Sequence, residues 1–142
     1  MCLEKKYPLP VRPRVSTGWK WMVYQLDGKY RSPLRVSWTA KSVSLGELVN
    51  EEEFREEESP ISLHCENPPF EPYPTGWHIS LTRAGARRFR RECKKSLDIS
   101  CWHIGERLVL TRVSFEEVVA WGEQYGHRVV VTRLMKVLGR TR

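Results

Sequence analysis

The chain has 142 residues, of which 40% are hydrophobic and 29% charged. This is long enough for one domain with a real core and no disulfide staples. There is no run of about 18 apolar residues, so we expect no membrane span. The N-terminus lacks the apolar stretch of a signal peptide. We therefore expect a cytoplasmic protein with reduced thiols, with residues 1–17 as an extended lead-in and 18–142 as a single domain.

Charge is unevenly distributed along the chain, whose formal net charge is +7 at pH 7. Residues 1–46 carry nine Lys and Arg against two acidic residues, a net charge of +7. Residues 47–76 carry one Arg against nine Glu, a net charge of −8, and residues 77–142 carry fourteen Lys and Arg against six acidic residues, a net charge of +8. Two basic blocks therefore flank an acidic one, which bears on the choice of partner rather than on the fold.

The stretch GWKWMVYQLDGKYRSPL predicts a β-hairpin. Residues 19–24 alternate with the period of a strand, and residues 30–34 would form the returning strand. Between them, Asp27-Gly28 is typical of a tight turn, which needs positive φ. Because Trp19 and Trp21 share a parity, we expect both to face the core.

The segment 44–60, SLGELVNEEEFREEESP, has two interpretations. Ser44 and Glu47 match a capping box, so a short helix could begin there and end at Pro60. The seven glutamates from Glu47 to Glu58 favour a solvated acidic loop instead. A further alternative is a tether that covers a basic surface until a partner binds.

A helix is predicted over residues 83–95, after an irregular proline-rich connection at 66–75 and a strand at TGWHISL. Thr82 can cap this helix. Ala86, Phe89 and Cys93 lie on one face of it, which is therefore apolar.

Three strand candidates follow, RLVLTRV, EVVAW and RVVVTRLMKV, with a hairpin loop expected at 122–126. The predicted fold class is α+β, a mainly antiparallel twisted sheet with one basic amphipathic helix and an acidic insert.

The helix sequence RAGARRFRRECKK holds five arginines and two lysines against one glutamate. Solvated helix faces usually mix signs, and like charges at helical spacing cost a few tenths of a kcal/mol per pair. An anionic partner or the acidic segment would offset that cost, and arginine favours bidentate contacts to phosphate or carboxylate. The alternative is a helix face that simply meets water. We predict a partner-binding site made of Arg87, Arg88, Arg90, Arg91, Lys94 and Lys95.

Other candidate chemistry is weak in this sequence. The chain has six tryptophans, and we expect most of them in the core. His64-Cys65 and Cys101-Trp102-His103 offer zinc ligands, but at spacings unlike those of zinc fingers, so we predict no metal. Cys2 would become an N-terminal nucleophile if Met1 were removed, without further support from its neighbours. No Walker, GxGxxG, HExxH or GxSxG motif occurs, and we expect no cofactor.

Several short stretches, in order, resemble an uncharacterised family of small bacterial and phage proteins. These are GWKWMV, DGKYRSPL, Trp38, Cys65, GWHIS, and VV followed by GHR. The matching positions are Trp19, Arg31, Ser32, Pro33, Leu34, Trp38, Cys65, Gly76, His78, Val118, Val119, Gly126 and Arg128. The chain departs from the family at Ile79, Ala120 and Val129, and residues 82–106 are longer and more basic. The resemblance implies a shared fold over about residues 18–138.

The outline GWHISLTRAGARRF followed by RLVLTRV is also similar to ADP-ribosyltransferase-like folds. That resemblance implies a catalytic glutamate, for which Glu116, Glu117 and Glu123 are the local candidates. It also implies a nucleotide pocket, which we place at Tyr24, His78 and Arg128.

We therefore expect a small, basic, non-enzymatic binding protein that docks on nucleic acid, a ribonucleoprotein or an acidic protein surface, with no membrane partner. Inhibition of a host nucleic-acid machine by a phage or mobile element would suit its size and charge. The alternative is an ADP-ribosyltransferase-like enzyme or nucleotide-binding protein.

Overall fold

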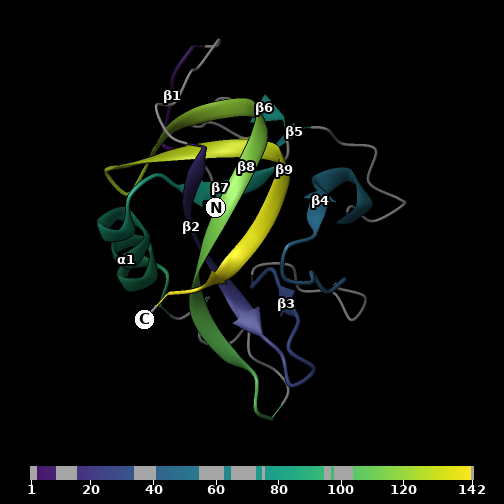
Figure 1. The fold of residues 1–142 in the computed structure, drawn as a ribbon. Coiled ribbons are helices and arrows are strands. Elements are labelled where there is room, and N and C mark those ends of the chain that lie inside the picture. The colour runs from purple at the N-terminus through teal and green to yellow at the C-terminus, as the bar shows by residue number, and fades with distance from the viewer. Residues whose placement is uncertain are drawn as a thin grey trace.

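The computed structural model describes residues 3–8, 16–33, 41–54, 63–64, 73–74, 76–94, 97 and 104–141. Over these residues it is mostly antiparallel β-sheet, with the helix Arg83–Glu92 packed beside it (Figure 1). Its helices are α1 (Arg83–Glu92) and the short 3₁₀ helix η1 (Glu51–Phe54). Its strands are β1 (Lys5–Lys6), β2 (Thr17–Tyr24), β3 (Tyr30–Arg31), β4 (Leu48–Asn50), β5 (Leu63–His64), β6 (Tyr73–Pro74), β7 (Trp77–Ser80), β8 (Arg107–Gln124) and β9 (His127–Arg140).

The two long strands β8 and β9 form the frame of the molecule. They pair along nearly their whole length around a turn at Tyr125 and Gly126, where both residues have positive φ, 50° and 75°. β8 also pairs with β2, β2 with β7, and β7 with β9, so these four strands close into a ring. Register shifts interrupt the β8–β9 ladder near 112–113 and 118–120, and such bulges bend and twist a strand. The bends let two long strands reach partners on both sides.

The main core fills the space enclosed by this ring. Met22, Ile79, Val130 and Met135 are completely buried there. The expectation that Trp19 and Trp21 face the core is wrong, because both are only half-buried and neither belongs to the main core, which Met22 joins from the same strand. The hairpin itself is confirmed by the antiparallel pairing of β2 with β3.

Helix α1 begins as the sequence predicts. The Thr82 hydroxyl accepts a 3.0 Å hydrogen bond from the Gly85 amide, and Ala86 and Cys93 are buried on the face toward the sheet. The indole N–H of Trp21 donates a 2.8 Å hydrogen bond to the Ala86 carbonyl, which ties the helix to β2. The helix ends at Glu92 rather than at Lys95, and Lys95 lies outside the described residues.

The strand predicted at TGWHISL, residues 75–81, is confirmed as the shorter β7, but the prediction for the C-terminal region needs correction. RLVLTRV and EVVAW are parts of the single strand β8, because its bulges let it continue where the sequence suggests a break. The turn that follows is confined to Tyr125 and Gly126, so the loop expected at 122–126 is too long.

The acidic segment has local structure where it is described. β4 pairs with the late part of β9, and η1 follows it directly, while residues 55–60 lie outside the described residues. At the other end of the chain, β1 pairs with β8, and Leu3 is buried against it. Within the described part of the chain, no helix has both the length and the apolar character needed to cross a membrane.

Candidate functional site: a basic cleft beside helix α1

An open cleft of about 930 Å³ lies between α1 and the sheet. Its walls come from the start of α1, the end of β2, the β2–β3 turn, the start of β8 and the end of β9. We call it the basic cleft. Its lining residues are Trp21, Tyr24, Gly28, Tyr30, Leu45, Arg83, Arg87, Arg107, Leu108, Val109, Leu110, Gly139, Arg140 and Thr141.

One wall of the basic cleft is the first turn of α1. Arg83 and Arg87 are four residues apart, so their side chains project from one side of the helix, about 6 Å apart along its axis. Arg90 continues this row and lies over the Trp21 ring at 5.9 Å from its centroid. The hydrogen bond from Trp21 to the helix backbone therefore fixes the distance between this wall and the sheet.

The opposite wall is built on Tyr24. The guanidinium of Arg140 lies 4.3 Å from the centroid of the Tyr24 ring, and that of Arg107 lies 5.5 Å from it. Such cation–π contacts hold the flat guanidinium groups against an aromatic plane. Tyr30 packs against Tyr24 at 5.3 Å between centroids, and burial raises the pKa of Tyr30. The Tyr30 hydroxyl therefore stays protonated at neutral pH.

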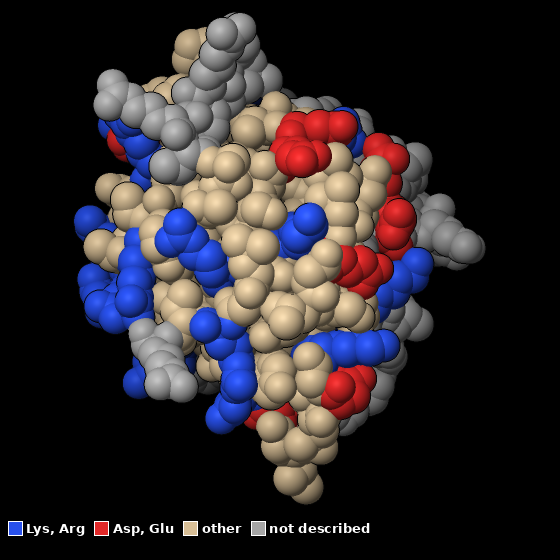
Figure 2. All heavy atoms as spheres, in the orientation of Figure 1, with Lys and Arg blue, Asp and Glu red and all other residues tan. Residues whose placement is uncertain are grey.

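The electrostatics of the basic cleft are one-sided. Four arginines from three elements line it, and none of the described residues that line it is acidic. Figure 2 shows Lys and Arg gathered on the side that carries α1 and the C-terminal end, while most Asp and Glu of this face lie toward β4 and η1. Like charges this close are unfavourable, and a bound anion would relieve the repulsion.

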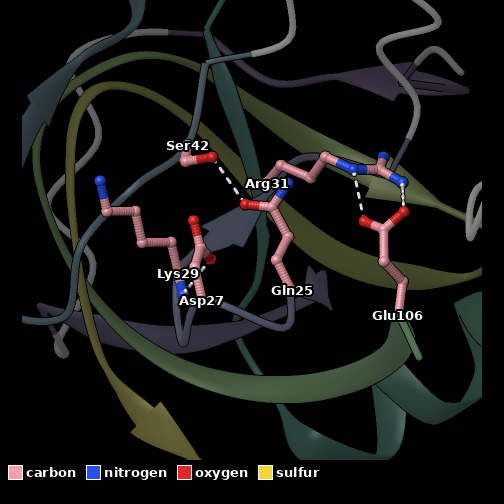
Figure 3. A network of polar contacts seen from close by, with 6 residues as sticks. All are labelled: Gln25, Asp27, Lys29, Arg31, Ser42 and Glu106. Carbon is pink, nitrogen blue, oxygen red and sulfur yellow. Dashed lines mark hydrogen bonds and ion pairs between the residues drawn. The ribbon is translucent and has the colours of Figure 1, made fainter. Parts of the chain in front are cut away.

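A buried ion pair supports the sheet wall (Figure 3). Arg31, at the end of β3, makes a two-pronged contact with Glu106, at 3.0 Å from Nε to Oε2 and 3.2 Å from Nη2 to Oε1. The two side chains are 4% and 2% exposed. Tyr30 and Arg107, which precede and follow these residues, both line the cleft. The ion pair therefore joins two segments that carry cleft residues.

The structure divides the six predicted partner-binding residues. Arg87 lines the basic cleft, and Arg90 lies over Trp21. Arg88 instead lies against the β8–β9 turn, where a Cβ added at Gly126 would be 3.2 Å from its Nη1. Arg91 and Lys94 are exposed and do not line the cleft, and Lys95 is outside the described residues.

The predicted pocket of Tyr24, His78 and Arg128 is not assembled in this cleft. Only Tyr24 lines it. His78 is on β7 opposite Val131, and Arg128 lies 5.8 Å from the Trp121 ring centroid.

The cleft residues missed by the sequence analysis are Trp21, Arg83, Arg107 and Arg140. Arg83 belongs to the basic stretch but not to the six predicted partner-binding residues, although its spacing of four from Arg87 places both on one side of the helix. Arg107 and Arg140 are far apart in the sequence. Arg107 is paired with Tyr24 in the β2–β8 register and Arg140 with Thr111 in the β8–β9 register, so only the folded sheet brings both to the Tyr24 ring.

A second polar cluster lies beneath α1, away from the basic cleft. Ser80 Oγ is 3.1 Å from His127 Nε2, and the Cys93 thiol and the Tyr125 hydroxyl form a 3.3 Å hydrogen bond. Burial, and then the nearby Arg88, lower the pKa of His127, so its imidazole is neutral at pH 7. The hydrogen bond with Cys93 is the main cause that raises the pKa of Tyr125 to about 12.

The described residues give no support to the hypotheses of a catalytic glutamate, an N-terminal nucleophile or a zinc site. Glu116, Glu117 and Glu123 are on the later half of β8 and do not line the basic cleft. Cys2 and three of the four zinc candidates, Cys65, Cys101 and His103, lie outside the described residues, and His64 is on β5. Among the described residues, no group of three His, Cys, Asp or Glu is placed to hold a metal ion.

Comparison of the chain with protein-family models, with curated proteins and with solved structures finds no significant match.

Proposed function

We propose that this chain is a small binding protein that holds a polyanion in the basic cleft. Its partner would be a nucleic acid, a ribonucleoprotein or an acidic protein surface. The observation that carries the proposal is the convergence of Arg83, Arg87, Arg107 and Arg140 on one cleft whose described lining residues include no carboxylate.

Arginine suits this role for two physical reasons. Its guanidinium is charged at every physiological pH, and its fork of N–H donors fits a phosphate or carboxylate in a bidentate way. Two of the four arginines are also held against Tyr24, which reduces the side-chain entropy that each would lose on binding.

The two walls of the cleft would act together. Arg83 and Arg87 would contact the anion from the helix, and Arg107 and Arg140 from the sheet. Displacement of counterions by the bound polyanion would make affinity fall with salt. For four phosphate contacts, the slope of log K against log salt is about −3 to −4.

The test compares two variants with equal net charge. Arg87→Gln with Arg107→Gln removes one arginine from each wall. Arg91→Gln with Lys94→Gln removes two exposed charges, one in the last turn of α1 and one just after its C-cap, that do not line the cleft. Both variants fall from +7 to +5 in formal charge.

Binding is measured by fluorescence anisotropy, at about 50 mM salt, with two labelled probes: a single-stranded 12-mer of deoxythymidine and a peptide of twelve glutamates. The cleft variant should lose at least about tenfold in affinity for the bound probe, and its salt slope for the single strand should be about 1.4 units shallower. The control variant, Arg91→Gln with Lys94→Gln, should change the affinity and the salt slope far less. Equal losses in the two variants would mean that net charge, not the cleft, drives binding, and would overturn the proposal.

A further inference from the structure

We propose that the ligand of the basic cleft is single-stranded nucleic acid, with at least one unpaired base stacked on the Arg140 guanidinium that lies against Tyr24. This inference rests on the proposed function and names the partner class for the same site. The observation behind it is that the cleft combines phosphate-binding arginines with aromatic planes, which a purely electrostatic site does not need.

The first step concerns the surface that a base would meet. Arg140 and Arg107 lie on Tyr24 with centroid distances of 4.3 and 5.5 Å, and Tyr30 packs against the same ring. Arg140 is an exposed residue that lines the cleft, and its guanidinium group is flat and delocalised. Nucleic-acid bases stack both on aromatic rings and on arginine guanidinium planes.

The second step concerns the phosphates. Arg83 and Arg87 are on the facing wall, and neither is on the Tyr24 stack. A base on the Tyr24 side would leave its sugar-phosphate backbone within the cleft, toward the helix. The cleft therefore offers both halves of a nucleotide a matching surface: a guanidinium held against an aromatic ring on one wall and the guanidinium donors of the exposed Arg87 on the other.

The third step concerns shape. Proteins that read a duplex insert a protruding helix or ribbon into a groove, whereas these arginines line a recess. A recess of about 930 Å³ is at the upper end of the size range of small-ligand pockets. Unpaired nucleotides can enter such a recess, but the paired bases of a duplex are stacked inside it and cannot reach Tyr24.

An acidic protein segment is the rival occupant. Its carboxylates would engage the guanidinium groups, but they would gain nothing from the planarity of the Arg140–Tyr24 stack. Replacement of arginine by lysine separates the two cases, because lysine keeps the charge and loses the plane.

The experiment uses the full chain and Arg140→Lys, with Arg91→Lys as the matched control on the exposed side of α1. Four labelled 12-mers are compared by anisotropy: single-stranded deoxythymidine, the same backbone without bases, a blunt DNA duplex and a peptide of glutamates. Tyr24→Leu is a second variant that removes the ring plane, and its fold is checked by circular dichroism.

We expect the single strand to bind about tenfold or more tightly than the abasic backbone, since base stacking on aromatic groups contributes about that much per base. Arg140→Lys and Tyr24→Leu should each remove most of that preference. Each should lower affinity for the single strand by a larger factor than affinity for the abasic backbone, and Arg91→Lys should leave all four affinities unchanged.

Other outcomes separate this inference from the proposed function. Equal affinity for the single strand and the abasic backbone, with loss in the cleft variant, would overturn base stacking and leave polyanion binding intact. Tighter binding of the duplex or of the glutamate peptide would also overturn the single-strand inference alone. Absence of binding to all four probes would overturn both.

Discussion

Loss of the Glu106 charge should destabilise the protein strongly. Glu106→Gln keeps the size of the side chain but leaves Arg31 charged in a site where the two side chains are 4% and 2% exposed. A unit-charge attraction at 3.0 Å is worth about 5 kcal/mol at an effective dielectric constant of 20. Removing one partner of a buried pair typically costs about 3–5 kcal/mol, because the other charge stays buried.

The assay is urea unfolding followed by tryptophan fluorescence at pH 7. We expect this assay to show a loss of about 3–5 kcal/mol in the free energy of unfolding. For a chain of this size, that loss would lower the melting temperature in a thermal scan by roughly 10–15 °C. The internal control is Glu52→Gln, since Glu52 pairs with Arg133 at the same 3.0 Å, but with side chains 57% and 29% exposed. That exposed pair should contribute no more than about 1 kcal/mol.

A double variant tests the cause. Arg31→Met with Glu106→Leu removes both buried charges and should recover part of the stability lost in Glu106→Gln. If Glu106→Gln cost no more than Glu52→Gln, the burial argument would be refuted. If the double variant were less stable than Glu106→Gln alone, the explanation by an uncompensated charge would fail.

Three further predictions concern other parts of the fold. Because the folded pKa of His127 is lowered, its contribution to stability is complete above about pH 6.5 and decreases as the pH falls below that value, by up to about 1.4 kcal/mol per pH unit. Unfolding titrations of His127→Gln should lack this part of the slope, and an unchanged slope would exclude His127 as its source. Gly85→Ala should destabilise α1, although alanine is the better helix former, because the added Cβ would lie 2.6 Å from His127 Cδ2. Ala84→Gly at an exposed position of α1 measures the difference in helix propensity alone and should cost about 1 kcal/mol of stability. If Gly85→Ala stabilised the protein, the close contact with His127 would be refuted. Gly122→Ala would place a Cβ on the Lys5 carbonyl oxygen, so β1 should detach and its amides exchange faster; unchanged protection in β1 would refute this pairing.

The sequence predicts the local elements well where one strong signal governs them. The Asp27-Gly28 turn and the Thr82 cap are in the structure, because turn and cap chemistry depends on a few adjacent residues. The strand predicted at 75–81 is confirmed over Trp77–Ser80, and the overall α+β character is confirmed as well. Lys95 and the zinc candidates other than His64 fall outside the described residues, so predictions that rest on them stay predictions.

The sequence predicts less well what depends on long-range pairing. The parity of Trp19 and Trp21 suggested a core face, but the closed ring buries Met22 instead, and Trp21 binds the backbone of α1. Bulges in β8 join two predicted strands into one, and periodicity within a short window cannot reveal a bulge. The basic cleft needs both the ring and the register, since Arg107 and Arg140 meet Arg83 only in the fold.

The most direct test of polyanion binding in the basic cleft is an NMR titration of the arginine side chains. The Nε–Hε signals of the ¹⁵N-labelled protein are followed as the single-stranded 12-mer is added. The account predicts that Arg83, Arg87, Arg107 and Arg140 shift together and saturate with one affinity, while Arg91 does not follow them. Shifts confined to Arg91 and its exposed neighbours, or no saturable shift in the four cleft arginines, would contradict the account.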